Sequence, residues 1–266
     1  MEEMVSLRSE RKMPAHKKLR SFTCSVGWVV FVMKVAYSGR MAETRPSDHR
    51  LDLSRTDRLA RGKVRDVFAR PGHPDQLLKT LRKTKRAAYA RRRGLIARIK
   101  RHIGLGPYRY LLKEYRCYLR VALRAERLDR PIPIAEFGPV IRTDRGLAQV
   151  SRRVPDRSGA LAPTLRELLR AGPLNTALLK QLNAFVGDLY DLNVVVPDLT
   201  AGNVVLDETV PDGRFLLIDG YGEKAFIPLQ TYFPALNARA LDRGFARIAS
   251  GSVLRWNGSD RRFERQ

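Results

Sequence analysis

The sequence predicts an α+β fold with a sheet-rich first half and a helix-rich second half. Short segments of alternating apolar and polar residues, separated by turns that contain Gly or Pro, lie between residues 58 and 81 and again between residues 134 and 150. Apolar residues at helical spacing form one long segment between them and dominate after residue 164. With 266 residues, 44% of them hydrophobic, the chain can form one large domain or two small lobes.

Two or three antiparallel strands are predicted at the start of this region. The segment Leu59–Ala69 alternates apolar and polar side chains around Gly62. Pro71-Gly72, together with Pro74-Asp75, marks a turn, and Gln76–Leu81 then forms a short strand.

A long helix is predicted over Tyr108–Leu128, where apolar side chains recur at helical spacing between basic ones. The apolar side chains are Leu111, Leu112, Tyr115, Leu119 and Leu123. Pro131 and Pro133 end this helix. The segments Ile134–Arg142 and Leu147–Val150 follow, and the Gly-bearing turn between them predicts a hairpin.

Two further helices are predicted in the second half. Thr164–Glu167 has the pattern of a capping box and begins a short helix that ends near Gly172. Asn175–Asp191 is the next helix, because its apolar residues share one face. It leads directly to Pro197, so the second half of the chain is expected to be mostly helical.

The net charge of +24 predicts attraction to nucleic acid, an acidic membrane surface or a phosphorylated substrate. Much of it lies in a basic block, residues 79–130, with 18 Lys and Arg against three acidic residues. Tyrosines lie between these Lys and Arg residues, a pattern that suits binding to nucleic acid. Binding to anionic lipid head groups would explain the block equally well. It could also be an ordinary solvated surface. The sequence leaves these three interpretations open.

Cysteine and histidine residues exclude two kinds of site. Cys24 and Cys117 are lone thiols in unlike contexts, so they predict neither a disulfide framework nor a metal site, and they suit a reducing compartment. The four histidines are scattered without metal-ligand spacing.

The segment with the most chemical content is Asp198–Asn203, in which an Asp lies five residues before an Asn. After a short insert, the apolar run Phe215–Ile218 ends in Asp219-Gly220. This layout is typical of phosphoryl transfer: the first carboxylate meets the acceptor hydroxyl, and the Asn and the second carboxylate bind Mg²⁺ on ATP. Two ordinary turns would explain the same residues. A hairpin between Asn203 and Asp219 would place both at adjacent strand ends, as a shared metal requires.

These residues resemble the catalytic and metal-binding loops of the protein-kinase-like superfamily. The resemblance implies that Asp198 and Asn203 are catalytic and that Asn203 and Asp219 bind Mg²⁺. The superfamily's His-Arg pair is absent, because Val196-Pro197 stands before Asp198.

The same resemblance implies that Lys79 grips the phosphates of ATP, with Glu114 as its partner on the following helix. A phosphate-covering turn would contain Gly62, Lys63 and Arg65. One glycine stands there instead of three.

Further motifs narrow the resemblance to the bacterial YrbL family of PhoP regulatory network proteins, over roughly residues 58–250. The motifs are Arg65–Phe68, Leu78-Lys79, Lys113–Arg116, Asp198–Leu206, Ile218–Gly222 and Phe226–Leu229. The family implies a two-lobed protein-kinase-like fold with a sheet-rich N-lobe and a reduced helical C-lobe. We therefore expect a basic and apolar extension at residues 1–50, an N-lobe with a basic helical insert at 51–155, and a C-lobe with the catalytic and metal loops at 156–266.

The function expected from this resemblance is ATP- and Mg²⁺-dependent phosphoryl transfer to an unidentified hydroxyl acceptor. One alternative is a pseudokinase, a regulatory nucleotide-binding module with little turnover. A second is a basic adaptor that binds nucleic acid or an anionic membrane surface through residues 79–130.

The N-terminal extension has two interpretations. Lys17–Arg20 precedes the apolar run Phe22–Met33, which resembles a secretory signal and is shorter than the ~20 residues of a membrane span. We favour a start at Met41, since an enzyme that uses ATP works in the cytoplasm. We expect a cytoplasmic protein, and peripheral binding at the inner face of the membrane stays open.

Overall fold

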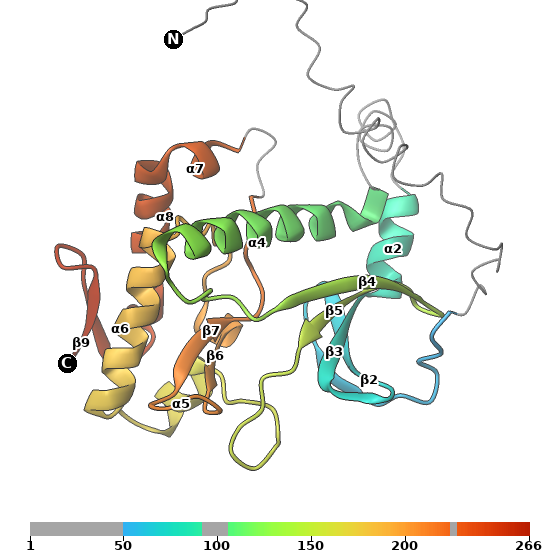
Figure 1. The fold of residues 1–266 in the computed structure, drawn as a ribbon, viewed down its shortest axis with the longest axis horizontal. Helices are drawn as coiled ribbons and strands as arrows, with labels where there is room; N and C mark the ends of the chain where they lie inside the picture. The colour runs from blue at the N-terminus through green and yellow to red at the C-terminus, as the bar shows by residue number, and fades with distance from the viewer. Residues whose placement is uncertain (1–49, 92–105, 224–227) are drawn as a thin grey trace, which may run out of the picture. The chain divides into compact units, whose positions relative to one another are not determined.

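A five-stranded antiparallel sheet forms the first half of the structure (Figure 1). The computed structural model describes residues 50–91, 106–223 and 228–266. The strands are β1 (Arg58–Arg61), β2 (Arg65–Arg70), β3 (His73–Leu81), β4 (Phe137–Thr143) and β5 (Gly146–Arg152). Their order is β1-β2-β3-β5-β4, so the two predicted strand regions join through β3 and β5. Both predicted strand regions are confirmed.

Strand β3 begins three residues earlier than the sequence predicts, at His73. Pro74-Asp75 belongs to this strand and not to the turn, which is confined to Pro71-Gly72. The pairing of β2 with β3 is irregular at this end, and β3 pairs with β5 only from Gln76 onward. A proline is tolerated there because the ladder needs no amide hydrogen from it.

The two faces of the sheet have different surroundings. Phe68, Leu78, Ala148 and Val150 pack with Leu53 in a small buried core. Because side chains alternate along a strand, the neighbouring residues point to the opposite face. That face carries Arg65, Val67, Ala69, Leu77, Lys79 and Gln149, which are opposite or adjacent across paired strands.

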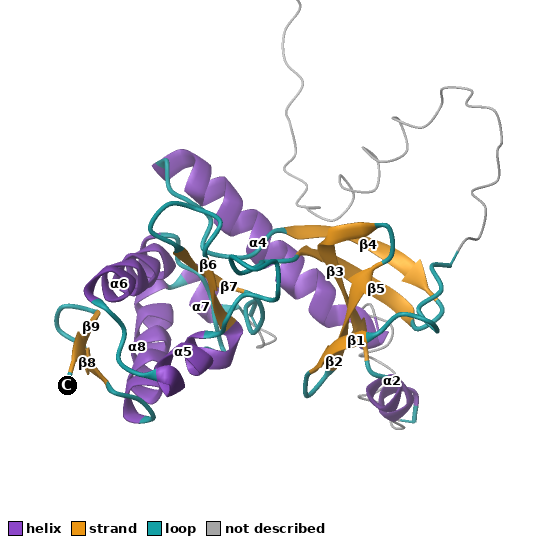
Figure 2. Ribbon diagram, turned by 90° about the horizontal axis from the view of Figure 1, so that it is seen from below, coloured by secondary structure: helices purple, strands orange, loops and turns teal. Residues whose placement is uncertain are grey.

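Among the residues that the structure describes, most helices lie in the second half, and two precede β4 in the chain (Figure 2). They are α2 (Lys83–Ala90), α4 (Arg109–Leu128), α5 (Leu165–Ala171), α6 (Thr176–Asp191), α7 (Leu229–Tyr232) and α8 (Pro234–Ser250), with short 3-10 turns at Gly106–Tyr108 and Ala201–Asn203. The predicted helices over 108–128, 165–172 and 175–191 are confirmed. So is the predicted α+β class.

Helix α4 links the sheet to the helical half, as Figures 1 and 2 both show. Near its start, Glu114 contacts the sheet through Arg65. Further along, Cys117, Val121 and Ala125 pack in the large core that α6 and α8 also build. One rigid element therefore touches both halves of the described chain.

Helix α5 begins with the predicted capping box. The Thr164 hydroxyl accepts from the amide of Glu167, and the Glu167 carboxylate accepts from the amide of Thr164 at 2.8 Å. A two-stranded hairpin, β6 (Val204–Asp207) and β7 (Arg214–Leu217), then lies against the large core.

A second hairpin, β8 (Leu254–Asn257) and β9 (Arg262–Arg265), ends the chain and is absent from the sequence prediction. Its strands are only four residues long and mostly polar, so they carry little alternating signal. Packing holds them: Trp256 stacks on Phe245 of α8 at 4.9 Å, and Phe263 meets the same ring edge-on at 5.6 Å.

Several predictions lie outside the described residues. They include nearly all of the extension at 1–50 and the part of the basic block at 92–105. The boundary expected between an N-lobe ending at 155 and a C-lobe beginning at 156 stays a prediction. In the part of the chain that the structure describes, no helix combines the length and the apolar character that a membrane crossing needs.

Candidate functional site

Asn203 and Asp219 are neighbours because the β6–β7 hairpin joins the segments that carry them. Val204 pairs with Leu217, so Asn203 directly precedes one strand and Asp219 follows the other. The amide of Ile218 donates to the carbonyl of Asn203 at 2.9 Å and closes this end of the hairpin. The predicted hairpin, with both residues at adjacent strand ends, is confirmed.

The loop that carries Asp198 is held at the same place by two hydrogen bonds. The amide of Asp198 donates to the carbonyl of Gly220 at 3.2 Å. The side-chain amide of Asn203 donates to the carbonyl of Asp198 at 2.9 Å. Gly220 has φ +84°, and a Cβ there would lie 2.6 Å from that same carbonyl oxygen, so only glycine fits. Asp198 itself is exposed, which leaves its carboxylate accessible.

Arg65, on β2, binds two carboxylates at this end of the hairpin. Its guanidinium donates to Glu114 at 2.7 Å and forms an ion pair with Asp219. Arg65 and Glu114 are each 7% exposed, and the ring centroid of Tyr110 lies 5.3 Å from the guanidinium carbon. Burial alone would lower the pKa of Arg65, but the two carboxylates outweigh it and raise that pKa. The site therefore contains a permanently charged guanidinium.

Glu114 does not pair with Lys79, which corrects the expected partnership. Within the described residues Glu114 has its ion pair with Arg65, and no ion pair joins it to Lys79. A guanidinium carries five donors in a fork, so Arg65 can hold Glu114 and Asp219 at once. The ammonium of Lys79 donates instead to the carbonyl of Ile218 at 2.6 Å. Lys79 thus reaches the hairpin end by another contact.

Lys79 is a buried amine without an ion pair in the described part of the chain. Burial and, to a lesser extent, the nearby charge of Arg65 lower its pKa to about 8, against the opposing effect of Asp219 and Glu114. In the unfolded chain the same group titrates near 10.5. The folded protein therefore holds this charge at an energetic cost, which is typical of a side chain kept for function rather than stability.

We expect Lys79→Met to stabilise the fold at pH 7 by about 1–3 kcal/mol, because it removes a buried charge and keeps the side-chain volume. The gain should shrink as pH rises from 8 to 10.5, since the folded lysine is then neutral while the unfolded one still binds a proton. Urea unfolding of both proteins at pH 7 and pH 10 measures this difference. A destabilised variant, or a gain that does not change with pH, would contradict the burial argument.

A sequence model of the family described as PhoP regulatory network protein YrbL matches residues 51–252. The chain belongs to the YrbL family. The match contains every residue discussed in this site.

Two other comparisons add little to the YrbL assignment. No curated protein matches the chain. Among solved structures, the chain is similar to the crystal structure of the Mycobacterium tuberculosis PknI kinase domain, a double mutant, at 18% identity and a TM-score of 0.41. That likeness covers 74% of each chain.

The turn expected to cover phosphates is exposed in this YrbL-family structure. It joins β1 to β2, and the amide of Gly62 donates to the carbonyl of Arg65 at 2.8 Å. Gly62 and Lys63 are exposed and, within the described residues, make no hydrogen bond or ion pair with Asp198 or Asp219. The structure thus brings Arg65 into the site and leaves Gly62 and Lys63 at its edge.

Asn203 and Asp219 offer oxygen donors of the kind that Mg²⁺ prefers. The side-chain nitrogen of Asn203 donates to the carbonyl of Asp198, so the side-chain oxygen of Asn203 points away from that carbonyl. Oδ1 of Asp219 accepts from Arg65 and from the amide of Gly220, while Oδ2 has no hydrogen-bond partner in the described part of the chain. No group of three or more His, Cys, Asp or Glu side chains among the described residues could hold a metal alone. Asn203 and Asp219 therefore suit a Mg²⁺ ion whose other ligands would be phosphate oxygens.

Sequence reasoning missed the contacts that hold Arg65 in this YrbL-family site. Tyr110 lies four residues before Glu114 and so shares its helix face, a signal that was available. Gln149, which accepts from Arg65 at 3.4 Å, lies opposite Lys79 in the β3–β5 pairing, and no local pattern indicates that. Phe226 and Ile227 of the Phe226–Leu229 motif lie outside the described residues.

Proposed function

We propose that this YrbL-family protein is an ATP- and Mg²⁺-dependent phosphotransferase that acts on a hydroxyl acceptor. The observation that carries the proposal is the gathering of Asp198, Asn203 and Asp219 at one end of a hairpin, beside Lys79. A carboxylate, two oxygen ligands and an amine suit the positioning and charge neutralisation on which phosphoryl transfer depends.

Each residue has a role in the proposed reaction. The acceptor oxygen bonds to the γ-phosphorus, the bond from that phosphorus to ADP breaks, and the hydroxyl proton passes to Asp198. Asn203 and Asp219 would hold Mg²⁺, which neutralises phosphate charge when bound. Lys79 and Arg65 add positive charge from the sheet.

The sheet face above these residues supports a nucleotide in particular. Val67, Ala69 and Leu77 lie on the same face as Lys79, and all three are only partly buried. Half-buried apolar side chains next to charged ones suit a flat base attached to phosphates.

A second candidate is a nucleotide-binding module with little turnover. One observation favours it: the guanidinium of Arg65 forms an ion pair with Asp219, the proposed metal ligand. If that pair persisted with nucleotide bound, Mg²⁺ would have to share the carboxylate with a permanent cation.

Calorimetric titration with ATP, with and without Mg²⁺, tests the nucleotide site. We expect Mg²⁺ to strengthen ATP binding in the native protein, and Asp219→Asn to weaken the Mg²⁺-dependent binding at least about tenfold, because it removes a ligand charge. Asp212→Asn is the matched control, since Asp212 is exposed at the opposite end of the same hairpin. An equal effect of Mg²⁺ in both variants, or no ATP binding at all, would contradict the proposal.

A further inference from the structure

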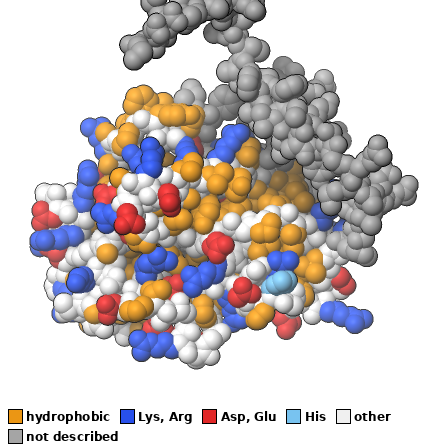
Figure 3. All heavy atoms as spheres, viewed as in Figure 1, with side chains coloured by type: hydrophobic (Ala, Val, Ile, Leu, Met, Phe, Trp, Pro, Cys, Tyr) orange, Lys and Arg blue, Asp and Glu red, His pale blue; other side chains and the backbone are white. Residues whose placement is uncertain are grey.

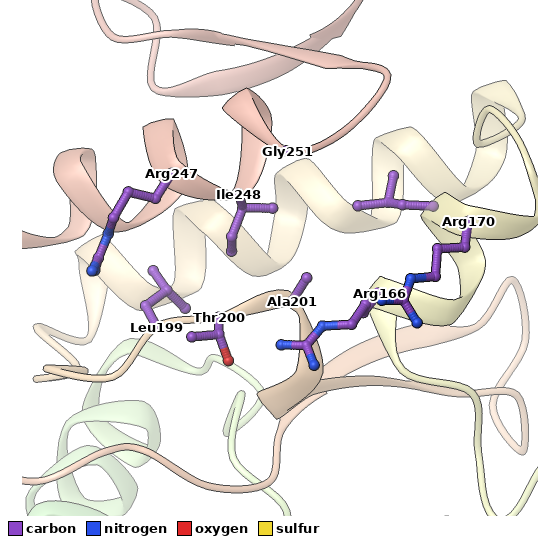
Figure 4. Close-up of a pocket in the computed structure, with 9 residues that line it drawn as sticks. Arg166, Arg170, Leu199, Thr200, Ala201, Arg247, Ile248 and Gly251 are labelled. Atoms are coloured by element: carbon purple, nitrogen blue, oxygen red, sulfur yellow. The ribbon is translucent and has the colours of Figure 1, made fainter.

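A cavity of about 320 Å³ lies directly beside the loop that carries Asp198 (Figure 4). Its walls come from α5, from α8 and from residues 199–201 of the loop itself. The charged side chains that line it are Arg166, Arg170 and Arg247. Thr200 adds a hydroxyl, and Leu199, Ala201 and Ile248 supply apolar surface. Figure 4 shows that the arginines come from two different helices, with Leu199, Thr200 and Ala201 of the loop between them.

The two helices and the loop that line the cavity pack closely on one another. A Cβ on Gly202 would lie 2.9 Å from the guanidinium of Arg166, so the missing side chain leaves room for this arginine. On the other side, a Cβ on Gly244 of α8 would lie 2.8 Å from Leu199. Leu165 of α5 and Leu241 of α8 share the large core with Leu199 of the loop, so both helices lie against it.

The three arginines lack carboxylate partners within the described residues. Basic and acidic side chains are interspersed over the face seen in Figure 3. Some other arginines of the described chain are paired: Arg152 forms an ion pair with Asp207, and Arg157 forms one with Glu208. Glu167 lies next to Arg166 in sequence, but its carboxylate accepts from the amide and the hydroxyl of Thr164 at the helix cap.

Arg247 also keeps donors free for a ligand. Its Nε donates to the carbonyl of Arg243, which leaves the terminal amino groups of the guanidinium. The carboxylate of Glu167 interacts electrostatically with Arg170 and Arg166, so one negative charge stands against three guanidinium groups, none of which has an ion pair in the described residues. This excess of positive charge around one cavity suits a phosphate group better than a neutral one.

We propose that this cavity binds a phosphate already present on the acceptor, so that the substrate is a small phosphorylated hydroxyl compound. This inference rests on the proposed phosphotransferase function. Thr200 is two residues from Asp198, a chain distance of at most about 7 Å. A sugar phosphate spans such a distance, with its phosphate on the arginines and a free hydroxyl at Asp198. Transfer of the γ-phosphoryl group to that hydroxyl would give ADP and a bisphosphate.

Phosphate binding measured with the nucleotide site blocked tests the inference. The full chain is saturated with Mg²⁺ and a non-hydrolysable ATP analogue and then titrated with inorganic phosphate and with hexose and pentose monophosphates. We expect the double variant Arg166→Gln/Arg170→Gln to bind inorganic phosphate and the sugar monophosphates about tenfold or more weakly. Its affinity for the ATP analogue should stay unchanged. Arg239→Gln/Arg243→Gln is the matched control, because it removes two exposed arginines at the same spacing on α8, outside the cavity.

The outcomes separate this inference from the function on which it rests. Equal weakening in both double variants, or none in either, would overturn the cavity assignment while analogue binding keeps the nucleotide site intact. Binding of anionic vesicles or a phosphopeptide, but of no sugar phosphate, would overturn the small-molecule substrate. Loss of all nucleotide binding with phosphate still held in the cavity would contradict the phosphotransferase itself. Transfer to sugar monophosphates but not to the matched free sugars, lost in the cavity variant alone, would support the inference.

Discussion

Phosphoryl transfer should fall by about 10²–10⁴-fold in Asp198→Ala, while the affinity for Mg²⁺ and ATP stays unchanged. The structure separates these two effects. Asp198 takes part in the loop through its backbone amide and carbonyl, which alanine retains. Its side chain is exposed, so removing it leaves no buried group unpaired. The loop, Asn203 and Asp219 should therefore keep their positions, and only the carboxylate that we propose as the proton acceptor is lost.

The measurement is ADP release, with and without acceptor, together with calorimetric nucleotide binding. Asp57→Ala provides the control, because Asp57 is also exposed and is remote in sequence from the loop. Equal turnover in Asp198→Ala and in native protein would remove Asp198 from the reaction. Absence of turnover in both, with nucleotide still bound, would favour the binding module over the enzyme.

Arg65→Met should destabilise the fold by about 3–5 kcal/mol, because it leaves the buried carboxylate of Glu114 without its cation. Burial already raises the pKa of Glu114, and the charge of Arg65 is the largest influence that opposes this rise. Without Arg65 the pKa of the carboxyl group would rise further, and a Glu114 that stayed ionised would be an unpaired buried charge. Both outcomes weaken the contact between β2 and α4.

The double variant Arg65→Met/Glu114→Leu should recover most of that loss, since an apolar pair of similar volume often replaces a buried ion pair without penalty. Asp219 keeps 40% side-chain exposure and can be solvated in both variants. Urea unfolding measures the coupling. The control is Arg262→Met, since Arg262 and its partner Asp260 are each at least half exposed and their ion pair should contribute no more than about 1 kcal/mol. An Arg65→Met loss as small as that of the control would show that Glu114 is satisfied by other groups.

Local sequence patterns were sufficient to predict the elements whose hydrogen bonds join residues close together in the chain. The capping box at Thr164 and the helix over 109–128 follow from spacing and turn chemistry, and both appear in the structure. The β8–β9 hairpin does not follow from local pattern, because Trp256 and Phe263 are held by Phe245 from another element. Pro74 likewise could not be placed from local pattern. It lies in β3 because no hydrogen bond of the strand pairing needs an amide hydrogen at that end.

In the site too, some residues could be predicted from local sequence order, and others depend on the tertiary structure. The order of Asp198, Asn203 and Asp219, with an apolar run before the last, is a property of consecutive residues. It was enough to predict that a hairpin would bring two of them together. The partner of Glu114 could not be predicted in this way. Arg65 is 49 residues away in the chain, and Lys79, the alternative partner, is also a cation. Choosing between two cations requires the register of β2 against β3 and the position of α4, which many distant contacts set together. The cavity arginines are a similar case: α5 and α8 are far apart in sequence, and packing in the large core, with close approaches at Gly202 and Gly244, brings them to one loop.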